Sequence, residues 1–334
     1  MDSIDGERGR RSGEERIAVS SLRAHVAPEG GRCMGADHVG ADRADRVALD
    51  GEPSGATGSR RAILEVRGLC KRYPSFALED VSFAVEPGSI TGLVGRNGAG
   101  KTTTLRCIAG ASRPDGGEVA CFGRPLVGNE AAVKQVVGFV FGGALYYETK
   151  RLSTIAAVTR RFYELWDEGT FERLMARFSL DGSKRVRELS QGMRVKFALA
   201  LALSHGARLL VLDEPTSGLD PLSRDDLLDL FLDVVSDGRT GILFSTHITS
   251  DLDKCADAIV HLRGGHVEAA CPLARYRSRY RVVPLDEARR AGATVLGERR
   301  TATGSTVLVP VEAGIGRSAD LEEIMTHLDK EDVR

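Results

Sequence analysis

From residue 62 onward, apolar and polar positions alternate with the short period that is typical of β-strands. Ile63, Leu64 and Val66 open one such run, and a second follows with apolar positions at Leu78, Val81, Phe83 and Val85. Because the side chains of a strand point to alternate faces, this pattern predicts two strands of an antiparallel sheet. The next apolar run, Ser89 to Val94, predicts a buried strand, and Thr103 to Ala109 predicts a helix.

A helical period replaces the strand pattern between Leu152 and Leu180. Apolar residues there recur three and four positions apart among charged residues, at Ile155, Val158, Phe162, Trp166, Phe171, Leu174 and Phe178. That spacing places them on the inner faces of consecutive helices. We therefore expect an inserted helical subdomain at about residues 150–205, with Trp166 and these phenylalanines in its core rather than in a ligand site.

Two further buried strands are predicted at Ala207 to Leu212 and at Gly241 to Ser245, with an amphipathic helix, Leu222 to Val235, between them. A strand, a helix and a strand in succession predict a parallel sheet. A hairpin around Gly264 and Gly265 then closes a main domain at residues 62–268. Short strand-like runs and a final helix, Leu321 to Leu328, predict a small α/β appendage at residues 269–334.

Residues 1–61 have neither period. They are rich in Gly, Ala, Arg, Asp, Glu and Ser, so we expect a disordered tail, although a translation start further along, at Met34, would explain them as well. The tail lacks the apolar core of a secretory signal peptide.

Composition narrows the class of protein further. The 334 residues carry a formal net charge of −1 and a pI of about 6.7, so no global basic surface suggests a nucleic acid as the main partner. Six cysteines are scattered without zinc-type spacing, which favours reduced thiols in a cytosolic protein. No apolar run approaches the roughly 20 residues of a membrane span, so a membrane role would come through a partner.

One glycine-rich motif lies between the buried strand and the helix that follow residue 88. It fits the pattern GxxxxGK[ST] with the residues Gly95, Arg96, Asn97, Gly98, Ala99, Gly100, Lys101 and Thr102, and Thr103 continues into the helix. Glycines let backbone N–H groups turn onto phosphate oxygens, and the helix N-terminus adds its dipole. We expect Lys101 to reach the β- and γ-phosphates of a nucleotide and Thr102 to place its hydroxyl on Mg²⁺.

A pair of carboxylates follows a second apolar strand. Asp213 and Glu214 come directly after Leu212, and the carboxyl ends of parallel strands are where α/β sheets bind ligands. Asp213 can hold Mg²⁺ through its water shell, and Glu214 can polarise an attacking water. Upstream, Ser190 suits the N-cap of a helix, and Gly192 would let the backbone approach an anion.

Taken together, these motifs resemble those of the ATP-binding subunits of ABC transporters over roughly Ala62 to Val267. The resemblance implies a P-loop NTPase fold of ABC type, with a parallel core sheet, an antiparallel β subdomain and an inserted helical subdomain. It implies that Ser190 and Gly192 cap the γ-phosphate of ATP held by an opposite subunit, and that Asp220 links the two sites. It further implies that His247 contacts the γ-phosphate and orders Glu214, and that Tyr73 stacks on adenine.

One position departs from the family pattern. These subunits commonly carry a Mg²⁺-contacting glutamine after the strand that follows the phosphate loop, and the aligned residue here is Gly142, followed by Gly143. Glu148 is a possible substitute. Our hypothesis is that the main ligands of Mg²⁺ are Thr102 and water fixed by Asp213.

Four stretches look more specifically like the YtrB-like group of ABC-2 type exporters: Phe139 to Tyr147, the helix around Trp166, Phe244 to Lys254, and the end of the appendage at Leu321 to Met325. The resemblance implies an ATPase with Lys101, Glu214 and His247 as catalytic residues. It would act as a homodimer or with a paired ATP-binding subunit, on a separate membrane permease at the cytoplasmic face of the membrane. A soluble ABC ATPase acting on ribosomes or DNA, and a regulatory subunit with low turnover, stay open as alternatives.

Overall fold

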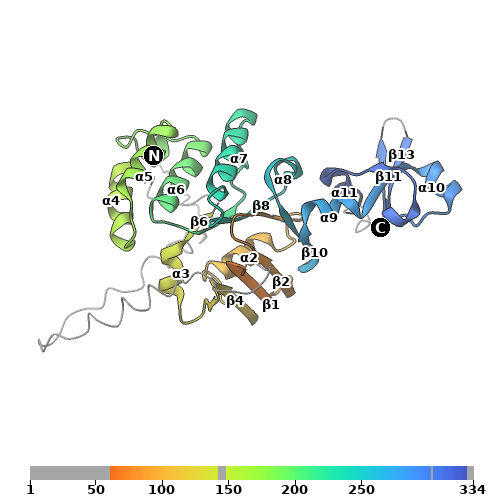
Figure 1. Ribbon diagram of the computed structural model, residues 1–334, viewed down its shortest axis with the longest axis horizontal. Helices are drawn as coiled ribbons and strands as arrows, with labels where there is room; N and C mark the ends of the chain where they lie inside the picture. Colours follow the sequence, from red (N-terminus) through yellow and green to blue (C-terminus); the bar gives the residue numbers. More distant parts are fainter. Residues whose placement is uncertain (1–60, 142–147, 302–303, 329–334) are drawn as a thin grey trace, which may run out of the picture. The chain divides into compact units, whose positions relative to one another are not determined.

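The computed structural model describes residues 61–141, 148–301 and 304–328 (Figure 1). The predicted tail, Met34 and the glycines at 142 and 143 lie outside these residues. Residues 57–334 form one compact unit, and the fold below concerns that unit alone.

An antiparallel sheet opens the described chain and confirms the first predicted strands. Strand β1 (Leu64–Tyr73) pairs with β2 (Phe76–Val85), and β4 (Gly116–Cys121) and β5 (Arg124–Pro125) extend the sheet in the order β2-β1-β4-β5. Leu64 lies opposite Val85, and Val66 lies opposite Phe83. All four of these side chains are buried, as the alternation predicted.

The central sheet carries the strands that end at the predicted motifs. Its order is β10-β9-β3-β8-β7-β6, with bounds β3 Ile90–Val94, β6 Val137–Phe141, β7 Leu209–Asp213, β8 Gly241–Thr246, β9 Ala258–Arg263 and β10 His266–Pro272. Strands β6, β7, β8, β3 and β9 are parallel, and β10 is an antiparallel edge paired with β9. Because parallel strands are covered on both faces, β3, β7 and β8 are buried throughout.

The predicted helical segments are helices in the structure, and two residues of the predicted inner faces are exposed. The helices are α2 Lys101–Ile108, α3 Glu130–Val136, α4 Leu152–Thr159, α5 Glu168–Arg177, α6 Gln191–Ser204, α7 Pro221–Val235 and α8 Thr249–Cys255, with 3₁₀ turns at Arg160–Phe162 and Val186–Glu188. Of these, α3 and α8 are additional to the prediction. Trp166, Phe171 and Phe178 pack in a cluster shared by α4, α5 and α6. Val158 and Phe162 do not: they are 50% and 61% exposed. At Phe162 the short 3₁₀ turn interrupts the helical period and carries the ring outward.

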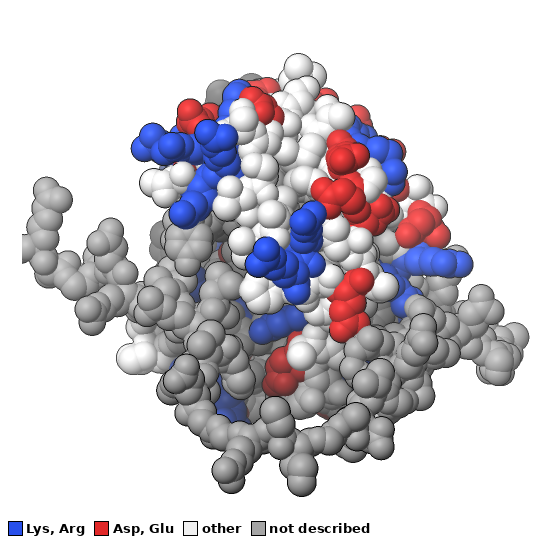
Figure 2. All heavy atoms as spheres, turned by 90° about the vertical axis from the view of Figure 1, so that its left-hand side faces the viewer, with Lys and Arg blue, Asp and Glu red and all other residues white. Residues whose placement is uncertain are grey.

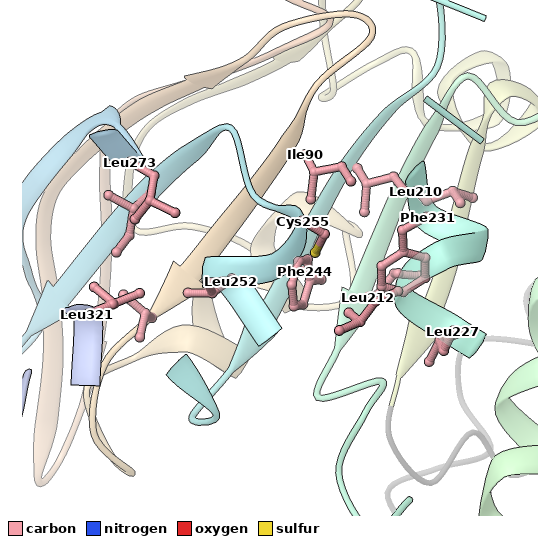
Figure 3. Close-up of a cluster of buried hydrophobic side chains, with 14 of the residues drawn as sticks. Ile90, Leu210, Leu212, Leu227, Phe231, Phe244, Leu252, Cys255, Leu273 and Leu321 are labelled. Atoms are coloured by element: carbon pink, nitrogen blue, oxygen red, sulfur yellow. The ribbon is translucent and has the colours of Figure 1, made fainter. Parts of the chain in front are cut away.

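The C-terminal segment adds a third sheet, of order β12-β13-β11-β14. Its elements are α9 Leu273–Ser278, β11 Tyr280–Pro284, α10 Leu285–Ala291, β12 Gly297–Thr301, β13 Gly304–Pro310, a 3₁₀ turn at Val311–Ala313, β14 Arg317–Ser318 and α11 Leu321–Leu328. The sequence predicted β11, β13 and α11 but not β12, whose residues are mostly polar. Leu273 and Leu321 join Leu252 in the same hydrophobic cluster as the central sheet, so the two regions share one core (Figure 3).

Charged side chains of both signs lie interspersed on the described part of the face that Figure 2 shows. This agrees with the near-zero formal net charge. The five cysteines within the described ranges are free. Among the helices of these ranges, none is long and apolar enough to cross a membrane.

Candidate functional site

Two glycines allow the phosphate loop its path between β3 and α2. Gly95 and Gly100 have φ values of 155° and 110°, which residues other than glycine rarely adopt. A Cβ at Gly95 would come within 2.3 Å of the Leu262 carbonyl oxygen, and one at Gly100 within 2.4 Å of the Leu78 side chain. The loop is therefore packed against β2 and β9 and turns into the N-terminus of α2 with no side-chain cap, which leaves backbone N–H groups for an anion.

Lys101 is the first residue of α2 and is only 6% exposed. Its ammonium donates to the carbonyl oxygen of Gly95 at 2.7 Å and lies 3.7 Å from the nearer carboxylate oxygen of Glu214. A buried cation held by the loop's own carbonyl and by an acid is preorganised to receive phosphate oxygens.

Asp213 is the centre of a hydrogen-bonded group at the carboxyl edge of the sheet. The hydroxyls of Ser245 and Thr102 both donate to its Oδ1, at 2.6 Å and 3.3 Å. Ser245 lies beside Asp213 in the parallel register of β7 and β8, and its hydroxyl also accepts the backbone N–H of Glu214 at 3.0 Å. Sequence reasoning missed Ser245, although a polar residue near the end of an apolar strand was the available signal.

The oxygen donors at this edge fit Mg²⁺. The Thr102 hydroxyl and the Asp213 carboxylate are hard ligands on adjacent elements, as Mg²⁺ prefers. Within the described residues, no group of three or more His, Cys, Asp or Glu side chains could hold a metal by itself. The remaining ligands of an ion placed here would therefore come from phosphate oxygens and water.

Glu214 and His247 form the second part of the site. Glu214 has a φ of 50°, a left-handed conformation that costs a residue with a side chain about 1–3 kcal/mol. An Nδ1–H of His247 donates to Glu214 Oε2 at 2.7 Å. Half of the His247 side chain is exposed, so this pair faces the open space in front of the phosphate loop.

That space is a cavity of about 540 Å³ lined by the phosphate loop, Lys101, Glu214, His247 and Ser217. Phe76, at the start of β2, also lines it. Tyr73 does not line it: its ring is 43% exposed, and its hydroxyl lies 3.5 Å from the Ser112 hydroxyl. The structure thus brings the phosphate-binding and acidic residues together and leaves the predicted adenine contact outside the cavity. Phe76 is an aromatic that the sequence analysis did not consider.

Three predicted residues lie at helix starts outside this cavity. Ser190 caps α6 as predicted, accepting the Met193 N–H at 3.3 Å, and Asp220 caps α7, accepting the Ser223 N–H at 3.0 Å. Hydrogen bonds from Ser223 lower the pKa of the Asp220 carboxyl, so this cap is ionised at neutral pH. Gly192 lies beside the loop before α7, because a Cβ there would come within 3.1 Å of Leu219. Ser190, Gly192 and Asp220 do not line the 540 Å³ cavity.

A parallel sheet with a phosphate loop after one strand, and an Asp-Glu pair after another, defines a P-loop nucleotide-hydrolysing protein. Comparison with known proteins specifies the family. A family model described as ABC transporter matches residues 78–217. YtrB, an ABC transporter ATP-binding protein of Bacillus subtilis, is 32% identical over 219 residues, which are 65% of this chain and 75% of YtrB.

Two further comparisons agree. NatA, another ABC transporter ATP-binding protein of B. subtilis, is 34% identical over 199 residues, covering 57% of this chain and 80% of NatA. A solved structure of the ATP binding subunit of an ABC transporter is 32% identical with a TM-score of 0.59, covering 64% of this chain and 92% of that one. The chain therefore belongs to the ABC transporter ATP-binding proteins and is an ATPase of that family. This confirms the predicted family and fold class.

Proposed function

We propose that two copies of this chain, or one copy and a paired ATP-binding subunit, close head to tail around two ATP molecules and drive a separate membrane permease. The observation that carries this proposal is the separation of the site into two parts. Lys101, Glu214 and His247 line one cavity, whereas Ser190 and Gly192 lie at another helix start outside it. A second chain can supply the missing signature to each cavity, with twofold symmetry relating the two sites.

Within each site, the roles follow from position and charge. Lys101 and the loop N–H groups would bind the phosphates, and the partner's signature would close over the γ-phosphate. Glu214, held by the His247 Nδ1–H, would accept the hydrogen bond of the attacking water and polarise it. Thr102 and Asp213 would hold Mg²⁺, which when bound neutralises charge on the phosphates.

A mixing experiment tests the shared site. Lys101→Ala removes the phosphate-binding cation, and Ser190→Arg blocks the signature, so each homodimer should be inactive. A one-to-one mixture of the two variants forms about half mixed dimers, and each of these has one intact site built from both chains. If the sites act independently, we expect about a quarter of the wild-type ATPase rate. A mixture that stays as inactive as its components, although mixed dimers form, contradicts the head-to-tail arrangement.

A permease partner is supported by apolar side chains that the fold leaves in water. Val158, Phe162 and Leu165, in and after α4, are 50%, 61% and 68% exposed. Clustered exposed apolar residues are typical of protein interaction surfaces. We place this surface against an integral membrane permease, at the cytoplasmic face of the membrane. The similarity to the YtrB-like group supports an exporter.

The Phe162→Ser variant tests this contact. It should fold and hydrolyse ATP as the wild type does, because Phe162 lies outside the cavity and outside the core. When the wild-type chain is affinity-purified from native membranes, an integral membrane protein should co-purify with it. That membrane protein should be missing when the Phe162→Ser variant is purified in the same way. Recovery of the same membrane protein in wild-type yield contradicts the proposed surface.

A further inference from the structure

A second group of buried polar side chains lies between α7, α8 and the segment that follows β7. It consists of Asp251 on α8, Arg224 on α7 and Thr216 in the segment between β7 and α7. Asp251 and Thr216 are 0% exposed, and the Nε of Arg224 is buried as well. None of these three residues belongs to the nucleotide cavity.

Four buried polar atoms of this group lack a hydrogen-bond partner among the described residues. They are both carboxylate oxygens of Asp251, the Thr216 hydroxyl and the Arg224 Nε. Arg224 Nε lies 3.9 Å from Asp251 Oδ1, which is an ion pair but too long for a hydrogen bond. Burial raises the pKa of the Asp251 carboxyl, and Thr216 and Arg224 offset that rise only in part. Native proteins rarely keep such costly groups without a role for them.

The position of the group suggests the role. Thr216 comes two residues after Glu214 and directly before Ser217, which lines the nucleotide cavity. Its carbonyl accepts the Leu219 N–H at 3.3 Å and so shapes the turn that leads to Asp220. Asp251 comes four residues after His247, and its N–H donates to the Ile248 carbonyl at 3.2 Å. The cluster therefore connects the segment that follows Glu214 in sequence with the segment that follows His247.

Helix α8 holds Asp251 in a fixed place relative to the phosphate loop. Its Leu252 packs on β3 where that strand has Gly92, and a Cβ at Gly92 would come within 2.2 Å of the Leu252 side chain. β3 leads directly into Gly95. Movement of Thr216 relative to Asp251 is thus movement of the segment 214–220 relative to the phosphate loop, and movement of Arg224 is movement of α7, which follows that segment.

We propose that Asp251 is a positioning residue, which through Thr216 and Arg224 holds segment 214–220 and segment 247–250 in the mutual register that ATP hydrolysis needs. The Asp251 carboxylate attracts the Arg224 guanidinium on α7 and the Thr216 hydroxyl, and it does not line the nucleotide cavity. The effect of its removal should therefore appear in the rate of turnover and not in ATP affinity. The inference rests on the proposed two-chain ATPase function.

The test compares Asp251→Asn with a matched control on the same two helices. Lys254 on α8 and Asp225 on α7 form an exposed ion pair at 2.5 Å. Asp225→Asn therefore removes an exposed α7–α8 ion pair while all three residues of the buried cluster keep their side chains. For each full-length variant, kcat and KM for ATP and the binding of a fluorescent ATP analogue are measured at a temperature where circular dichroism shows full folding.

We expect Asp251→Asn to lower kcat at least tenfold with KM and analogue affinity within twofold of wild type, and Asp225→Asn to change neither. A kcat within twofold of wild type for Asp251→Asn overturns the proposal, and so does an equal loss in Asp225→Asn. Thr216→Val provides a second variant that keeps the side-chain shape, with an expected loss of at least threefold in kcat. If Asp251→Asn does not fold, Thr216→Val tests the proposal alone, and an unchanged kcat in Thr216→Val overturns it.

Hydrogen exchange gives a readout that does not depend on turnover. Backbone amides of residues 214–220 and 247–250 should exchange faster together in Asp251→Asn, and neither set should do so in Asp225→Asn. Faster exchange confined to α8 contradicts the proposed link. If the wild type and Glu214→Gln hydrolyse ATP equally, the proposed function fails; if only Glu214→Gln is slow and Asp251→Asn matches wild type, the positioning role alone fails.

Discussion

Two histidines flank the strand that leads into the phosphate loop, and they differ in almost every respect. His247 directly follows β8 and His261 lies in β9, and β8 and β9 are the two neighbours of β3. The side chain of His247 is 52% exposed and bonded to a carboxylate, whereas His261 is 1% exposed and bonded through Nδ1 to the Tyr276 hydroxyl at 2.9 Å. The same residue type, in or after neighbouring strands of one sheet, thus faces the cavity on one side and lies in the core on the other.

The physical difference is access to water and to ligand. Burial lowers the pKa of His261 to about 4, so this imidazole is neutral under physiological conditions and contributes packing and one hydrogen bond. Tyr276 lies on α9, so the bond fastens the C-terminal segment to the central sheet. His247 faces the cavity and can exchange partners as a nucleotide enters.

We expect the largest effect from replacing His247, the exposed histidine of the pair. His247→Ala removes the donor that orients Glu214, and we expect kcat for ATP to fall about 10²–10⁴-fold. Because the side chain is half exposed, the urea midpoint of unfolding should stay near that of wild type. Steady-state kinetics and urea titration on one preparation check both statements. Near-normal turnover contradicts the role given to His247.

The buried His261 should make the free energy of unfolding depend on pH. The pKa of His261 falls from its usual value of 6.5 in the unfolded chain to about 4 in the folded chain, so the unfolded state binds the extra proton below pH 6.5. Stability should therefore decline from about pH 6.5 toward pH 4, by up to about 3 kcal/mol from this group. Urea unfolding of His261→Asn should lack that part of the decline.

The exposed His266 supplies the control for this effect. Its side chain is 60% exposed and lies 3.7 Å from Glu79, so His266→Asn removes an imidazole from the surface without changing the core. If His261→Asn and wild type lose stability in parallel between pH 6.5 and 4.5, the low pKa of His261 is wrong.

Tyr276→Phe tests the surroundings of His261 by removing a single hydroxyl, with a smaller expected loss of stability. It removes the hydroxyl that bonds His261 and leaves the buried ring nitrogen without that partner, which should cost about 1–3 kcal/mol of unfolding free energy. Tyr73→Phe removes a hydroxyl from an exposed ring and should cost less than about 0.5 kcal/mol. Urea midpoints of the two variants measured together decide the matter, and equal losses would contradict it.

The smallest expected effect separates the two aromatics near the cleft. Tyr73→Ala should weaken ATP binding about threefold to tenfold if the ring stacks on adenine, and should leave binding of inorganic triphosphate unchanged. Phe76→Ala should weaken both ligands, because Phe76 packs against the phosphate loop at Gly100. Calorimetric titration of both ligands gives the comparison. Loss of triphosphate affinity in Tyr73→Ala would contradict a role confined to adenine.

Much of the fold was predictable because local patterns and long-range packing agree. The buried strands β3, β7 and β8 are continuous apolar runs, and the turns into α2, α6 and α7 have their glycine, serine and aspartate at the right positions. Where the local pattern was weak, the prediction failed. β12 is mostly polar and is a strand only because β13 pairs with it, and Phe162 fits a helical period that a 3₁₀ turn interrupts.

The sequence by itself determined the phosphate loop, the Asp213–Glu214 pair and the capping residues Ser190 and Asp220, because each depends on neighbours within a few positions. Only the tertiary structure decided which distant groups meet them. Ser245 reaches Asp213 through strand register, and His247 reaches Glu214 from the end of the neighbouring strand. Asp251 lies near Thr216 and Arg224 through the packing of α8 on β3. The opposite burial of His247 and His261 was decided in the same way, since exposure depends on what the rest of the chain places over a residue.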